Sequence, residues 1–123
     1  MSALDPKEYA VLAAEAAAEK KATNVVVLDV ASTLVITEYF VLASGNNDRQ
    51  VRMIAEEIEA KLKAAGRPAI GREGEREGKW VLIDFADVVA HVFQPEEREF
   101  YRLEKLWSDA PQVELPAEIA NKS

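Results

Sequence analysis

The fold of this chain is decided by the stretch Lys79–Phe93, which reads KWVLIDFADVVAHVF. Apolar and β-branched residues lie on both sides of Ala86–Asp87, and this pattern predicts two strands, Lys79–Phe85 and Val88–Phe93. Because the connection between them is so short, we expect a tight antiparallel hairpin. The hairpin supplies two neighbouring strands of one sheet.

Successive side chains of a strand point to opposite faces, so the hairpin has two different faces. Its first strand carries two alternating sets: Val81, Ile83 and Phe85 on one face, and Trp80, Leu82 and Asp84 on the other. We expect the aliphatic set to pack under helices. The second set combines apolar residues with a carboxylate, which is the composition of a binding hot spot. Alternatively, Trp80 is a partly buried packing residue beneath the C-terminal segment or a helix.

The remaining elements are predicted from caps and hydrophobic periodicity. Asp5 and Glu8 form a capping-box pattern at the start of the first helix. The second helix carries one apolar stripe at spacings of three and four residues. The predicted helices are 5–21, Asp48–Ala65 and Glu97–Trp107, and the further strands are Asn24–Val30, Thr37–Ser44 and, at an edge, Pro68–Gly71.

This order of elements predicts an α/β (α+β) fold with a single mixed β-sheet. Three helices cover one face of such a sheet easily, whereas covering both faces would be hard with so few elements. One sheet face is therefore expected to be open. The 123 residues suffice for one compact domain. We expect it to span residues 1–110, with residues 111–123 as an extended or flexible tail.

The composition is that of a folded domain, and it excludes some functional classes. Apolar residues make up 49% of the chain and charged residues 30%, which is ordinary for globular proteins. The absence of cysteine excludes disulfides and thiolate metal sites. No signal peptide and no membrane-spanning run are predicted, so we expect a cytoplasmic protein without membrane contact.

The formal net charge of −7 bears on the class of partner. Binding to nucleic acid depends on Lys and Arg side chains that release counterions from phosphates, so broad contact with DNA or RNA is disfavoured. An acidic surface suits a basic protein partner instead and speeds the encounter with it.

The chain lacks the glycine-rich, Walker and zinc-protease motifs of common enzymes. His91 is the only histidine, and a structural or interface role is favoured for it over a catalytic one. Asp29 and Asp84 lie on predicted strands and could hold a metal if they approached each other across the sheet. The alternative is that each aspartate caps a backbone group or anchors a turn. No cofactor is predicted.

Several motifs together resemble a known family. They are TEYFVLASG at Thr37–Gly45, the W-V-L-x-D and H-V-F elements of Lys79–Phe93, and F-Y-x-L-E-x-L-W at Phe100–Trp107. In this order and spacing they resemble the ribosomal silencing factor (RsfS, Iojap-like) family, over about residues 5–110.

The resemblance implies a nucleotidyltransferase-like fold without catalytic residues. Active transferases need a metal-binding carboxylate pair after a Gly-Ser turn, whereas Ser44-Gly45 is followed here by Asn46-Asn47. The family resemblance also implies a cytoplasmic translational repressor that is a homodimer when free. Its partner would be ribosomal protein uL-fourteen on the large ribosomal subunit. The bound factor would sterically block joining of the small subunit when nutrients are scarce.

Carried over residue by residue, the resemblance implies partner contacts by Trp80, Leu82, Asp84, Tyr101, Glu104, His91 and Arg98. Trp80 would be the apolar anchor, and Asp84 would accept hydrogen bonds from the partner or pair with its Lys or Arg. Leu103 and Trp107 are expected to pack a helix on the sheet. The family commonly has glycine at position 86, so Ala86 indicates a turn that needs no positive φ.

Two other functions remain open from the residues alone. One is a nucleotidyltransferase-like, metal-dependent enzyme that uses Asp29 or Asp84. The other is a dimeric adaptor, unrelated to the ribosome, whose open face serves self-association.

Overall fold

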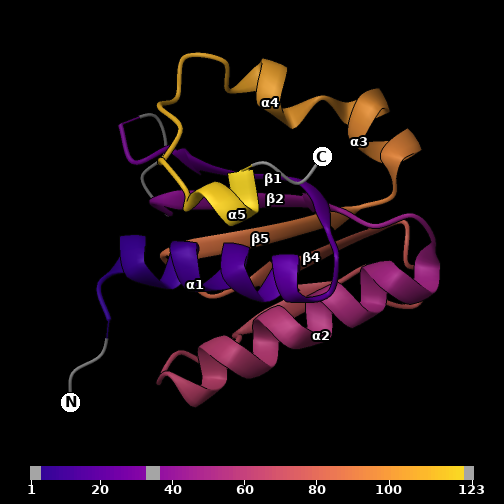
Figure 1. Cartoon of the computed structure of the whole chain (residues 1–123), viewed down its shortest axis with the longest axis horizontal. Coiled ribbons are helices and arrows are strands. Elements are labelled where there is room, and N and C mark those ends of the chain that lie inside the picture. The colour runs from indigo at the N-terminus through magenta and orange to yellow at the C-terminus, as the bar shows by residue number, and fades with distance from the viewer. Residues whose placement is uncertain (1–3, 33–36, 121–123) are drawn as a thin grey trace.

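The computed structural model describes residues 4–32 and 37–120 and contains one mixed sheet (Figure 1). Its strands are β1 (Thr23–Asp29), β2 (Tyr39–Ser44), β3 (Gly71–Glu73), β4 (Trp80–Asp84) and β5 (Val88–Phe93). They lie in the order β1-β2-β5-β4-β3, with β2 and β5 parallel and the other neighbours antiparallel. The predicted mixed sheet is confirmed, although the edge strand begins only at Gly71, the last residue of the predicted range Pro68–Gly71.

The β4–β5 hairpin forms as predicted, but its turn differs from the expectation. The Asp87 N–H donates to the Phe85 carbonyl at 3.1 Å, and the Ala86 N–H donates to Asp84 Oδ1 at 2.8 Å. Ala86 has a φ of 75°. The expectation that Ala86 avoids a positive φ is therefore wrong. The hydrogen bond across two residues closes a γ-turn, and one form of that turn places its central residue at positive φ.

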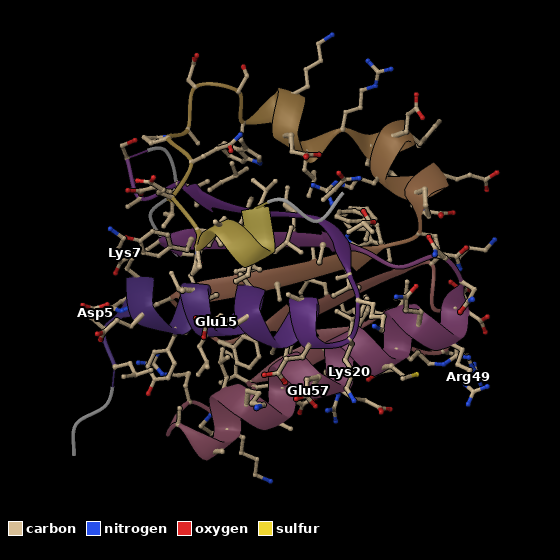
Figure 2. The ribbon with its side chains drawn as sticks, in the orientation of Figure 1. Asp5, Lys7, Glu15, Lys20, Arg49 and Glu57 are labelled. Carbon is tan, nitrogen blue, oxygen red and sulfur yellow. The ribbon has the colours of Figure 1, made fainter. Side chains whose placement is uncertain are left out.

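One face of the sheet is covered by α1 (Pro6–Glu19) and α2 (Asp48–Ala64) (Figure 1). Asp5 and Glu8 form the predicted capping box. The main core joins these helices to the sheet through Tyr9, Ala13, Ile54, Ile58, Leu62, Val41, Val81, Ile83 and Phe85. Charged side chains such as Lys7, Glu15 and Arg49 lie on the outer surface of this layer (Figure 2). Among the described helices, none has the length and apolar character that a membrane span requires.

The opposite face is partly covered by α3 (Pro95–Tyr101) and α4 (Leu103–Leu106) (Figure 1). The single helix predicted at Glu97–Trp107 is broken at Arg102, which has a φ of 49°. The expectation that all helices lie on the same face of the sheet is therefore wrong. A second, smaller core explains the position of α3 and α4. It consists of Leu28, Val30, Leu42 and Phe93, with Leu103 and Trp107 among the side chains packed against them.

The C-terminal segment runs beside β1. The Asp29 N–H donates to the Pro111 carbonyl, and the Val113 N–H donates to the Val27 carbonyl, both at 2.8 Å. The chain then forms α5 (Ala117–Ala120), where Ile119 is buried in the main core. The segment predicted as a tail therefore begins as an extended strand-like stretch against the sheet. The domain boundary at residue 110 stays a prediction.

Candidate functional site

The candidate site is the part of the second sheet face that α3 and α4 leave uncovered. The sheet register places Trp80 opposite Phe93, Leu82 opposite His91, and Asp84 opposite Val89. His91 is in turn opposite Leu42, and Val89 is opposite Phe40. Val81, Ile83 and Phe85 lie in the main core, on the opposite face from Trp80, Leu82 and Asp84. The predicted alternation is thus confirmed. We call the half-buried residues of this side the open face: Trp80, Leu82, Asp84, Val89 and Phe40.

Trp80 is half-buried and lies between the sheet and α3. Its ring stacks on Phe93 with a centroid separation of 5.1 Å, and the Tyr101 ring lies 4.6 Å away. Its indole Nε1–H donates to Nδ1 of His91 at 3.1 Å. Trp80 therefore packs against neighbouring rings, as one alternative expected, and it also presents surface to solvent. Its contact with a partner stays a prediction.

His91 lies beneath the open face, with 5% of its surface exposed. Phe40 meets its ring edge-on at 4.9 Å, and Phe93 is stacked at 5.9 Å. Burial among these rings lowers the pKa of His91 from 6.5 to about 4, so the imidazole is neutral at pH 7. Within the described residues, its Nε2 atom has no hydrogen-bond partner.

Arg98 and Glu104 join α3, α4 and β2. Arg98 is 8% exposed. Its guanidinium donates to both carboxylate oxygens of Glu104, at 3.1 and 2.6 Å. A third N–H donates to Ser44 Oγ at 2.8 Å. Because this bidentate pair bridges Arg102, it fixes α4 relative to α3 across the helix break. Glu104 keeps 39% of its side chain exposed, whereas Arg98 is committed to contacts inside the chain.

Tyr101 extends the open face onto α3. It is 48% exposed, and Phe100 beside it is 79% exposed and meets the Tyr101 ring edge-on at 5.0 Å.

Sequence reasoning missed Phe40 and Phe100. Alternation along Thr37–Ser44 could have placed Phe40 beside Leu42, but its position next to His91 required the parallel pairing of β2 with β5.

The two aspartates of the metal-site hypothesis do not meet. Asp29 lies on β1 and Asp84 on β4, with β2 and β5 between them. At the usual strand spacing this separates their backbones by roughly 14 Å, too far to share one ion. Asp29 Oδ1 accepts from the Ala31 N–H at 3.1 Å, so both aspartates cap backbone groups, as the alternative interpretation expected. Residues 4–32 and 37–120 contain no cluster of three or more potential metal-binding side chains.

Comparison with known proteins decides the family. The family model described as "Ribosomal silencing factor during starvation" matches residues 3–123. The chain belongs to this family. The ribosomal silencing factor RsfS of Bacillus subtilis is 40% identical over 112 residues, which cover 91% of this chain and 95% of that protein. The resemblance drawn from the sequence motifs is therefore confirmed.

A solved structure and a mouse protein are also similar to this ribosomal silencing factor chain. A crystal structure of a protein from Chromobacterium violaceum is 33% identical and has a TM-score of 0.84, covering 97% of this chain and 98% of that chain. The mouse protein named "Mitochondrial assembly of ribosomal large subunit protein 1" is 32% identical over 93 residues. That match covers 73% of this chain but 41% of the mouse protein.

Proposed function

We propose that this chain represses translation by binding the large ribosomal subunit at ribosomal protein uL-fourteen through the open face. The bound protein would occupy space that the small subunit needs, and so slow translation under nutrient limitation. Membership of the ribosomal silencing factor family supports a ribosome-associated silencing role. The name of the mouse relative supports the large subunit as the place of action.

The observation that carries the choice of surface is the half-exposed Trp80 beside Leu82 and Asp84. An aromatic anchor with apolar neighbours and a polar rim is the usual anatomy of a protein interface. The Asp84 carboxylate lies at this surface, and the Glu104 carboxylate is partly exposed on α4. Both suit a partner that presents Lys or Arg. The net charge of −7 favours the same class of partner.

The seven predicted contact residues take two roles in this proposal. Trp80, Leu82, Asp84, Tyr101 and Glu104 present surface and would touch the partner. His91 and Arg98 are buried and would hold the contact residues in place from below. The proposed action is steric, so it needs neither a reaction nor a cofactor. We place the protein in the cytoplasm, without direct contact to DNA.

Sucrose-gradient sedimentation with purified ribosomal subunits tests the proposal. We expect the wild type to travel with the large subunit and to reduce the amount of assembled ribosome. Trp80→Glu should lose both effects, because it places a charge at the centre of an apolar contact. The matched control is Met53→Glu, which makes the same kind of change at an exposed apolar residue of α2, in the layer over the other sheet face. Loss of binding by both variants, or by neither, would refute the choice of surface.

A dimeric adaptor is the competing function, and sedimentation velocity of the free protein distinguishes it. We propose that the chain is a homodimer when free and that Trp80→Glu does not change its oligomeric state. If Trp80→Glu is a monomer while the wild type is a dimer, the open face serves self-association. The adaptor would then become the leading interpretation.

A further inference from the structure

Trp80 owes its orientation to a directional contact from a buried neighbour. The stacking contacts with Phe93 and Tyr101 are attractive over a range of ring angles. The hydrogen bond from Nε1 to His91 Nδ1, at 3.1 Å, depends on the angle of the indole. An indole N–H can only donate, so Nδ1 of His91 must be unprotonated to accept it.

A histidine at position 91 is costly to folding. When Nδ1 accepts the indole N–H, the neutral ring carries its proton on Nε2, which is buried without a hydrogen-bond partner among the described residues. The residues opposite His91 on the two neighbouring strands are both leucines, Leu42 and Leu82. A leucine at position 91 would continue this apolar row without an unpaired ring N–H. Packing alone therefore does not explain the histidine.

We propose that His91 is a positioning residue, which accepts the Trp80 N–H and so holds the indole in the orientation that the partner binds. The proposal rests on the proposed function, because it assigns His91 a role at the same open face. His91 does not touch the partner in this mechanism, since 5% of its surface is exposed. It acts through Trp80, and the ring of Tyr101 closes over the indole from the α3 side.

Two substitutions separate the acceptor from the bulk of the ring. His91→Leu removes the acceptor and matches the neighbouring Leu42 and Leu82 in chemistry. His91→Asn places its amide oxygen on Cγ, where histidine has Nδ1, and so keeps an acceptor within reach of the indole. Thermal unfolding of each variant shows whether the fold persists. We expect His91→Leu to be at least as stable as the wild type, because it also removes the unpaired Nε2–H.

The orientation of Trp80 has its own spectroscopic signature. The chain contains two tryptophans, so a ¹⁵N–¹H spectrum shows two indole signals, and Trp107 serves as the internal reference. Loss of a hydrogen bond moves an indole proton upfield and speeds its exchange with water. We expect both changes for Trp80 in His91→Leu but not in His91→Asn. A Trp80 signal that is the same in wild type and His91→Leu would overturn the proposal.

Binding to purified large subunits then tests the consequence for function. We expect His91→Leu to bind about fivefold more weakly, the usual effect of losing one hydrogen bond, and His91→Asn to bind close to wild type. Wild-type affinity of His91→Leu would overturn the positioning role and leave the proposed function intact. So would an equal loss in His91→Asn when its Trp80 signal is unchanged. Failure of the wild type itself to bind would instead remove the proposed function, and the positioning role with it.

Discussion

At the scale of single residues, the burial of His91 ties the stability of the protein to pH. Its pKa is about 4 in the folded chain and 6.5 when exposed, so the unfolded state binds more protons between these values. The contribution of His91 to stability is therefore greatest above pH 6.5 and falls as the pH drops toward 4. We expect the free energy of unfolding to lose about 3 kcal/mol across this window through His91 alone.

Urea unfolding at pH 7 and pH 4 measures this effect. Other groups also titrate in acid, so the informative quantity is the difference between the wild type and His91→Leu. The wild type should lose about 3 kcal/mol more than the variant on going to pH 4. Parallel losses in the two proteins would mean that His91 is not held neutral by burial.

At the scale of elements, the β4–β5 turn stores strain at Ala86. An alanine side chain disfavours the φ of 75° found there, whereas glycine adopts it readily. We expect Ala86→Gly to raise the free energy of unfolding by about 1 kcal/mol. The control is Ala60→Gly at an exposed position within α2, which should lower stability by about 1 kcal/mol. A loss of stability in Ala86→Gly would show that the turn favours alanine.

The position of α3 and α4 on the sheet depends on Arg98. Removing its side chain leaves Ser44 Oγ and the Glu104 carboxylate without their shared donor. We expect Arg98→Ala to destabilise the protein by about 2 kcal/mol and to speed amide exchange in α4. Arg102→Ala, at an exposed arginine of the same bend, should change little. Equal effects of the two substitutions would argue against a lock formed by Arg98.

Elements with local signals were predictable from sequence, and those fixed by distant contacts were not. The capping box at Asp5 and the alternation in Lys79–Phe93 predicted α1 and the two faces of the hairpin, because both patterns act between near neighbours. The break at Arg102 was missed because a positive φ at arginine has no local signature and is stabilised by the Arg98–Glu104 pair. The pairing of Gln112 with Leu28 was missed as well, because it joins segments far apart in the chain and neither segment signals the other.

For the candidate site, sequence correctly grouped Trp80, Leu82 and Asp84 but could not separate contact residues from supporting ones. His91 and Arg98 have the residue types of an interface, and their burial follows from how β2, β5 and α3 meet. Phe40 joins the site through a parallel strand pairing that alternation does not reveal. Sequence therefore predicts the face on which a side chain lies more readily than the depth at which it is buried.

At the scale of the whole molecule, the two sides of the sheet present different chemistry. The layer formed by α1 and α2 carries charged side chains on its outer surface (Figure 2). The other side presents the aromatic and aliphatic residues of the open face, with the Asp84 carboxylate among them. A partner with an apolar recess and basic rim fits the open face better than it fits the charged helices.

Photo-crosslinking from position 82 tests this docking most directly. A photoreactive benzoylphenylalanine replaces Leu82 at the centre of the open face, and in a control protein it replaces Met53 on α2. After illumination with purified large subunits, we predict one crosslinked ribosomal protein, uL-fourteen, from position 82 and none from position 53. A crosslink from position 82 to ribosomal RNA or another protein, or equal crosslinking from both positions, would contradict the account.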